Sequence, residues 1–131
     1  MPASGSIVLD TNLAVKFLAS DRQIQKRVVE TERIIVSTIV LGELFYGAQH
    51  SDRLEENLKR VDDFAAHSEV IDADLETARR YGIIKSALRR KGTPIPDNDI
   101  WIAALAQQYS AAVATRDAHF DAIEGLEIAR W

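Results

Sequence analysis

The segment PDNDIWIAALA, residues 96–106, predicts a buried helix that begins beside acidic side chains. Asp97 and Asn98 are residue types that favour helix N-caps, and the proline before them ends any preceding helix. From Ile100 onward no face of the segment is polar, and a helix that is apolar all round lies inside a protein. One N-cap explains one acid. Asp99 is then a second acid beside the core, and it requires another explanation.

The composition is that of a globular protein with its own core. The chain has 131 residues, of which 47% are hydrophobic and 27% charged, which suits one domain over residues 1–131 with a short flexible leader at 1–5. No apolar run reaches the length of a membrane span, about 18 residues. The leader lacks the basic and apolar regions of a signal peptide. We therefore expect a cytoplasmic protein.

The chain is acidic and contains no cysteine. Its net charge of −4 disfavours a protein that binds nucleic acid by bulk attraction. It does not disfavour a metal-dependent nuclease, because bound cations partly neutralise the acids of such an enzyme. The lack of cysteine excludes disulfides, thiolate metal ligands and a cysteine nucleophile.

Short β-type runs alternate with helical segments along the chain. The predicted strands are residues 6–9, 33–36, 69–71, 111–115 and 126–128. The predicted helices are residues 11–19, 22–32, 38–49, 52–66, 73–91, 99–109 and 117–122. This alternation indicates an α/β domain with a mostly parallel sheet of about five strands.

Two acids follow predicted strands. Asp10 comes directly after the first strand, and Asp117 comes shortly after the fourth. Ligands of open parallel sheets bind outside the carboxyl ends of the strands, so we expect both acids at the functional edge. Each acid taken alone is equally well explained as the N-cap of the next helix.

Glu43 is the only charged residue in the apolar helical run 39–48. Glutamate is rarely buried without a partner, so this position predicts either a site, a salt bridge to lysine or arginine, or a side chain that reaches solvent. Gly42 and Gly47 flank it in the same run and permit close approach of another backbone, at some cost in helix propensity.

Carboxylates that are brought together repel one another, and a bound cation relieves this repulsion. A cluster of acids without cysteine is an oxygen-ligand site, which favours Mg²⁺ or Mn²⁺ over Zn²⁺. Such ions typically serve phosphate chemistry. We interpret His50, His67 and His119 as surface or core residues rather than ligands, although His119 lies near Asp117 and could touch a substrate.

These residues resemble a PIN domain and, more narrowly, the VapC-type toxin ribonucleases of bacterial and archaeal toxin–antitoxin pairs. The resemblance covers almost the whole chain, and four motifs in order, each centred on an acid, carry it. They are Leu9-Asp10-Thr11-Asn12, Gly42-Glu43-Leu44 with Tyr46-Gly47, Asn98-Asp99-x-x-Ile102-Ala103-Ala104, and Thr115-x-Asp117-x-x-Phe120.

The resemblance implies a three-layer α/β/α sandwich and metal-dependent endonucleolytic cleavage of RNA. It also implies a cognate antitoxin protein and a homodimer. The residues that match the acidic quartet of the family are Asp10, Glu43, Asp99 and Asp117. The supporting positions are Thr115, which matches a residue that hydrogen-bonds within the site, together with Asn12 and Asp97.

The mechanism that we infer from the resemblance is hydrolytic. Asp10 and Asp99 hold one or two Mg²⁺ ions, with Mn²⁺ as a substitute, and Glu43 and Asp117 act as further ligands or water-mediated partners. A metal-activated water attacks the phosphodiester in line and leaves 5′-phosphate and 3′-hydroxyl ends.

Three other functions compete with this interpretation. A phosphatase with an aspartyl nucleophile at Asp10 is disfavoured, because Asn12 stands where such enzymes carry a second aspartate. A PIN nuclease of RNA processing, outside toxin–antitoxin systems, would carry the same acids. A non-catalytic binding module would keep the fold and lose turnover.

Basic residues gather in the predicted helix 73–91 and at its end. End-capping by the helix dipole explains the last three, and a patch that contacts RNA phosphates is the alternative. The residues concerned are Arg79, Arg80, Lys85, Arg89, Arg90 and Lys91.

Overall fold

The computed structural model describes residues 5–131, and its centre is a parallel five-stranded sheet with the strand order β3-β2-β1-β4-β5. The predicted α/β class with a mostly parallel sheet is confirmed. The strands are β1 (Ser6–Leu9), β2 (Arg33–Ser37), β3 (Glu69–Ile71), β4 (Ala112–Thr115) and β5 (Ile128–Arg130). Except for Gly5, the predicted leader lies outside the described residues.

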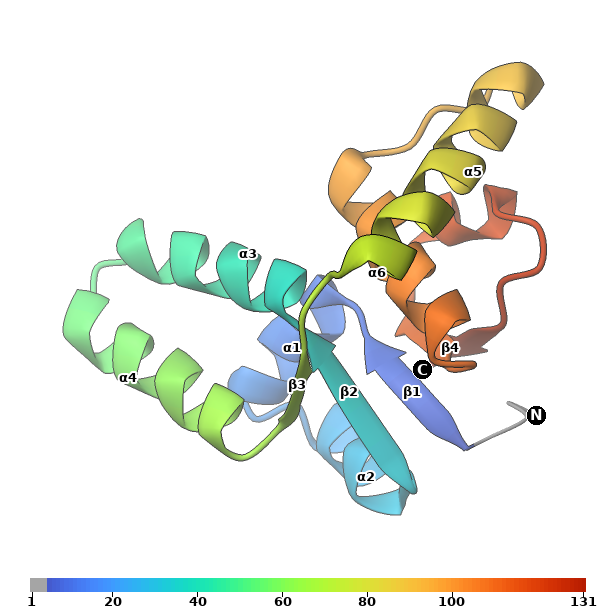
Figure 1. Ribbon diagram of the computed structural model, residues 1–131. Helices are drawn as coiled ribbons and strands as arrows, with labels where there is room; N and C mark the ends of the chain where they lie inside the picture. The colour runs from blue at the N-terminus through green and yellow to red at the C-terminus, as the bar shows by residue number, and fades with distance from the viewer. Residues whose placement is uncertain (1–4) are drawn as a thin grey trace.

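Helices cover both faces of this sheet (Figure 1). The helices α1, α2 and α4 pack on one face, and α5 and α6 pack on the other, which is the expected three-layer arrangement. Their bounds are α1 (Thr11–Leu18), α2 (Arg22–Glu30), α3 (Thr38–Gln49), α4 (Leu54–Ala66), α5 (Leu75–Lys91) and α6 (Asp97–Gln108), followed by the 3₁₀ helix η1 (Ala118–Ala122). No helix among residues 5–131 is long and apolar enough to cross a membrane.

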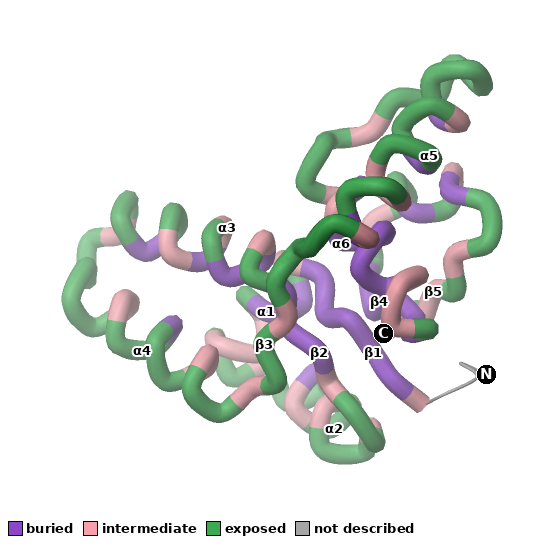
Figure 2. The backbone as a smooth tube through the Cα atoms, in the orientation of Figure 1, coloured by how far each residue is buried: buried purple, intermediate pink, exposed green. Residues whose placement is uncertain are grey.

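The core runs along the middle strands and α6 (Figure 2). Every residue of β1 and β4 is buried, as in a sheet that is covered on both faces. In α6 the apolar run is buried as predicted, apart from Trp101, which lies partly exposed and stacks on Tyr81 with 4.1 Å between the ring centroids.

Two boundaries differ from the prediction in an instructive way. Helix α6 begins at Asp97, with Pro96 at the N-cap and no side-chain cap hydrogen bond, so Asp97 and Asn98 are not the caps that the sequence predicted. The last strand forms two residues later than expected, at Ile128–Arg130, where its register with β4 pairs Ala114 with Ala129.

The strand order creates a topological switch point beside β1. The chain runs from β1 to β2 on one side, whereas β4 pairs with β1 on the other side. The two crossovers therefore leave the carboxyl edge in opposite directions and open a crevice there, which is the usual ligand site of an open parallel sheet.

Candidate active site

Two of the four predicted acids meet at this switch point. Asp10 follows β1 directly, is only 4% exposed, and accepts a 2.8 Å hydrogen bond from the Thr11 backbone N–H as the N-cap of α1. The hydroxyl of Thr115, at the end of β4, donates to Asp10 Oδ2 at 2.7 Å and accepts from the Asp117 backbone N–H at 2.9 Å. One buried hydroxyl thus couples the acids that follow two neighbouring strands.

The other two acids come from helices. Asp99 lies in the first turn of α6, half-buried, and Glu43 lies in α3, where the Thr11 hydroxyl donates to its Oε1 at 2.7 Å. Among the described residues no lysine or arginine pairs with Glu43, so the salt bridge that competed with a functional role is not formed.

All four acids line one open cleft. Its volume is about 440 Å³, within the range of small-ligand sites. The other predicted residues also lie there: Asn12 and Asp97 line the cleft, and Thr115 lies beneath Asp10. The structure therefore brings all the predicted site residues together in or directly beneath this cleft.

Asp97 differs from the other acids of the cleft. It is exposed, and its Oδ1 accepts from Lys85 Nζ at 2.9 Å. The hydrogen bond from Lys85, aided by Tyr81, lowers the pKa of Asp97 below its usual value. Asp97 therefore carries its own cation, which leaves it less available to a bound ion.

His119 lies in the cleft, near Asp117 as the sequence indicated, but its contact with two of the acids was not predicted. Its Nδ1 lies 3.0 Å from Asp99 Oδ2 and 3.2 Å from Asp117 Oδ1. The side chain of His119 is about half exposed, at 48%. The available signal was its position two residues after Asp117, in a short helix that the Asp117 side chain caps.

The electrostatics of the cleft resist full ionisation. Burial raises the pKa of Asp10, the hydrogen bonds from Thr115 and Thr11 lower it, and the charges of Asp117 and Glu43 raise it again. Burial also raises the pKa of Asp99, the hydrogen bond to His119 opposes this, and Asp10 and Asp117 add repulsion. A cation in the cleft would relieve both effects.

The donor set fits a divalent cation. Asp99, Asp117 and His119 each offer a ligand atom, and these atoms lie within 4.8 Å of one another. Asp10 and Glu43 add further carboxylate oxygens from the same cleft. Such an oxygen-rich set suits Mg²⁺ or Mn²⁺, and one imidazole does not change that preference.

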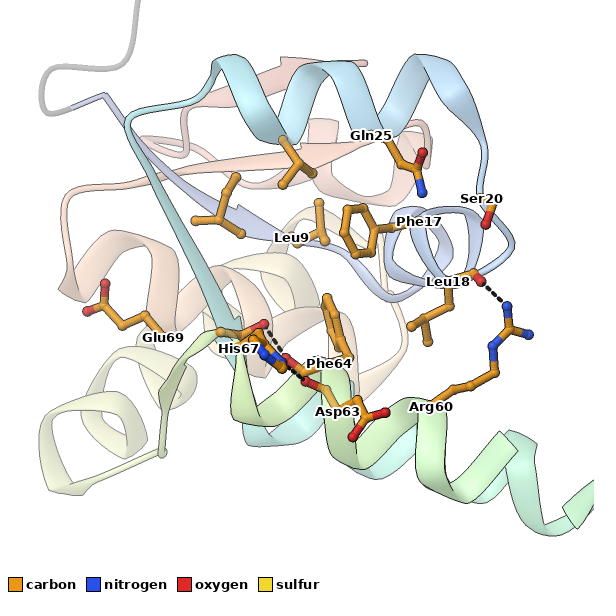
Figure 3. Close-up of a pocket in the computed structure, with 13 residues that line it drawn as sticks. Leu9, Phe17, Leu18, Ser20, Gln25, Arg60, Asp63, Phe64, His67 and Glu69 are labelled. Atoms are coloured by element: carbon orange, nitrogen blue, oxygen red, sulfur yellow. Dashed lines mark hydrogen bonds between the residues drawn. The ribbon is translucent and has the colours of Figure 1, made fainter. Parts of the chain in front are cut away.

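A second cavity lies on the face of the sheet under α1, α2 and α4 (Figure 3). Its lining includes Leu9, Phe17 and Phe64, and several of its polar groups form hydrogen bonds within the chain. Arg60 donates to the Leu18 carbonyl at 2.9 Å, and His67 Nδ1 lies 2.7 Å from the Asp63 carbonyl. The four acids lie in the 440 Å³ cleft and not in this cavity, so the candidate active site is that cleft.

Fold and cleft together define a class of protein. The family model of the PIN domain matches residues 7–126, and the chain belongs to this family. Among curated relatives, the tRNA(fMet)-specific endonuclease VapC of Salmonella typhimurium is 36% identical over 127 residues, which cover 95% of this chain and 96% of that protein. Ribonuclease VapC2 of Rickettsia felis is 32% identical over 129 residues, with the same coverage.

Solved structures agree. VapBC2 from Rickettsia felis, bound to a DNA fragment from its promoter, matches with a TM-score of 0.89 and 29% identity over 96% of this chain and 98% of that chain. DNA-bound VapBC from Salmonella typhimurium matches with a TM-score of 0.89 and 35% identity over 95% and 96%. Within the PIN domains, the chain is of the VapC type, as its four motifs predicted.

Proposed function

We propose that this chain is a cytoplasmic, metal-dependent endoribonuclease and the toxin of a type II toxin–antitoxin pair. The observation that carries the proposal is the convergence of Asp10, Glu43, Asp99 and Asp117 from separate elements into one cleft at the switch point of the sheet. The relatives named above are VapC ribonucleases, which supports RNA as the substrate.

We assign Mg²⁺, or Mn²⁺ in its place, to the cleft, held by Asp10 and Asp99 with Glu43 and Asp117 as further ligands. When bound, the cation supplies activation of a water molecule and neutralises negative charge on the phosphate oxygens. Thr115 holds the Asp10 carboxylate in place from below, and Thr11 does the same for Glu43. Both hydroxyls fix the direction of a carboxylate without adding a competing charge.

The proposed reaction is hydrolysis of the phosphodiester. The oxygen of water bonds to phosphorus and gives up a proton, the P–O3′ bond breaks, and the departing O3′ takes up a proton. The products therefore carry 5′-phosphate and 3′-hydroxyl ends. The 2′-hydroxyl is not the nucleophile. His119, which lies between the Asp99 and Asp117 carboxylates, keeps these two side chains at a fixed separation.

The proposed partners are a cognate antitoxin and a second copy of the chain. The two solved structures described above are of complexes named VapBC, which supports a protein antitoxin. An arginine from the antitoxin, placed among the four acids, would make charge-assisted hydrogen bonds and compete with the metal. Light scattering of the purified chain, with and without antitoxin, measures both associations.

Cleavage of a labelled RNA pool by pure protein tests the function. We expect cutting with Mg²⁺ or Mn²⁺, none in EDTA, and none by Asp10→Asn or Asp99→Asn. Asp97→Asn is the matched control, because it neutralises a carboxylate of the same cleft that is paired with Lys85; it should retain most activity. Cutting that persists in excess EDTA would refute the metal mechanism. No cutting by well-folded protein, together with no Mn²⁺ binding in calorimetry, would favour a non-catalytic module.

A further inference from the structure

Another groove, distinct from the cavity under α1, α2 and α4, adjoins the cleft of the four acids (the acid cleft) on the side of α3. The two cavities share Thr11, Glu43 and Asn98 as lining residues, so a strand whose phosphate lies at the acids would continue into this groove. Gly42 and Tyr46 line the groove beyond the shared residues. The groove is therefore an extension of the site, and the inference below rests on the proposed function.

Gly42 has no structural reason to be glycine. It lies inside α3, where glycine is among the poorest helix formers, and its φ is not in the left-handed region. Beyond its chain neighbours and the backbone of its own helix, a Cβ built on Gly42 would meet no atom of the described residues within 4 Å. The fold thus keeps open space above this residue although no part of the described chain fills it. Glycine commonly marks a place where a ligand approaches the backbone.

Tyr46 lies one helical turn after Gly42 on the same side of α3. Tyr46 is among the most exposed large hydrophobic residues, at 68%. Within residues 5–131 its only ring contact is an edge-on one with His50, with 4.5 Å between the centroids. A helical side chain covers the turn before its own Cα. The missing side chain at Gly42 therefore leaves the ring of Tyr46 accessible from the groove.

The lining indicates what the groove accepts. Its described residues include hydroxyls, the Asn98 amide, the Glu43 carboxylate and an aromatic ring, but no lysine or arginine. A phosphate group would find no cation there, whereas a ribose and base would find hydrogen-bonding groups and a ring. Unpaired bases of single-stranded RNA are typically bound by stacking on aromatic side chains.

We propose that the groove over Gly42 binds the nucleoside next to the scissile phosphate, with its base against the ring of Tyr46. Gly42 supplies the room, and Tyr46 supplies the stacking surface. Because stacking tolerates all bases, this subsite contributes affinity and positioning rather than a strict base preference.

Filling the groove tests the proposal. Gly42→Leu places a side chain in the open space, where its Cβ would meet nothing within 4 Å beyond its own stretch of helix. Gly47→Leu is the matched control, because Gly47 is also an exposed glycine of α3. It lines a different cavity, with Val15 and Leu44, which shares Glu43 alone with the acid cleft. Tyr46→Leu removes the ring, and Tyr46→Phe retains it.

Binding is measured in Mg²⁺ and low salt, in an Asp99→Asn background that prevents cleavage, with a single-stranded oligo(A) of about 12 nucleotides as the probe. The same strand without bases is the second probe. We expect Gly42→Leu and Tyr46→Leu to weaken oligo(A) binding about 5- to 150-fold, the range for loss of one stacked base. Gly47→Leu and Tyr46→Phe should bind like the parent, and the base-free strand should not distinguish the variants.

Three further readouts separate the outcomes. Thermal unfolding should show that both leucine variants at glycine positions are at least as stable as the parent, since leucine is the better helix former. Equal binding by Gly42→Leu and Gly47→Leu would overturn the proposal, and so would a change of oligomeric mass in Gly42→Leu, since the space would then belong to a second copy. Wild-type protein that binds oligo(A) in this Gly42-dependent way but never cleaves RNA would refute the proposed function and leave the subsite standing.

Discussion

Replacement of Thr115 by valine should disconnect the two acids at the ends of β1 and β4. Valine has nearly the same shape and suits a strand, so β4 is expected to persist. The substitution removes the 2.7 Å hydrogen bond to Asp10 and leaves the Asp117 N–H without its 2.9 Å acceptor. A hydrogen bond to a charged group contributes about 1.5–3 kcal/mol, and an unpaired donor costs about 1 kcal/mol or more.

We therefore expect the free energy of unfolding of Thr115→Val to fall by about 2–3 kcal/mol at neutral pH, since relaxation of the Asp10 side chain recovers part of the loss. For a domain of this size the midpoint of thermal unfolding should drop by about 6–12 °C. Thr115→Ser, which keeps the hydroxyl, is the control. Denaturant unfolding of wild type and both variants in EDTA provides the measurement.

The loss should also depend on pH, with a definite sign. The Thr115 hydroxyl opposes the burial that raises the pKa of Asp10, so its removal raises that pKa further. The variant then binds a proton at a higher pH than wild type does. The stability difference should be largest above both folded-state pKa values of Asp10, and should shrink as the pH falls through them. A variant as stable as Thr115→Ser, or a difference that does not change with pH, would refute the role of this hydroxyl.

Two further predictions concern charge. Asp99→Asn removes one of two carboxylates whose ligand atoms lie within 4.8 Å of each other, and this repulsion of about 1–3 kcal/mol outweighs or balances the lost contact with His119. In EDTA the variant should therefore unfold at or above the wild-type temperature, and added Mn²⁺ should stabilise it less than it stabilises wild type. Lower stability with an unchanged Mn²⁺ response would contradict this prediction. Charge reversal of Arg89 and Arg90 together should reduce the salt slope of RNA binding by about 1.4 if both contact phosphates, and an unchanged slope would exclude the end of α5 from the RNA path.

The sequence predicted the parts of the site that follow from local rules. Parallel strands end at the same edge, so the acids after β1 and β4 were expected at that edge, and the pairing of β1 with β4 in the structure makes them neighbours. Glu43 was identified because a lone charge in an apolar helix needs an explanation. The structure adds the link between Asp10 and Glu43. Thr11 donates its backbone N–H to Asp10 and its hydroxyl to Glu43, which no rule of sequence spacing predicts.

The contacts of His119 and Asp97, which the sequence did not predict, depend on tertiary distances. His119 joins the acids because η1 lies beside the start of α6, and Asp99 is 20 positions away in the chain. Asp97 was taken for a helix cap on its residue type. In the folded chain the carboxylate of Asp97 instead accepts a hydrogen bond from Lys85, which lies 12 positions earlier on α5. Capping rules describe one helix, and they contain no information about which cation a neighbouring helix presents.

The partners of the acids explain how the cleft stays ready for a cation. Thr115, Thr11 and His119 orient Asp10, Glu43 and Asp99, and two of these three donors are neutral hydroxyls. A lysine or arginine would offset the repulsion among the acids better, but it would occupy the position that a metal needs. Among residues 5–131, Lys85 is the one lysine that forms an ion pair with an acid of this cleft, and its partner is Asp97. Burial, together with repulsion from the neighbouring acids, raises the pKa values of Asp10 and Asp99, and a bound cation would offset both effects.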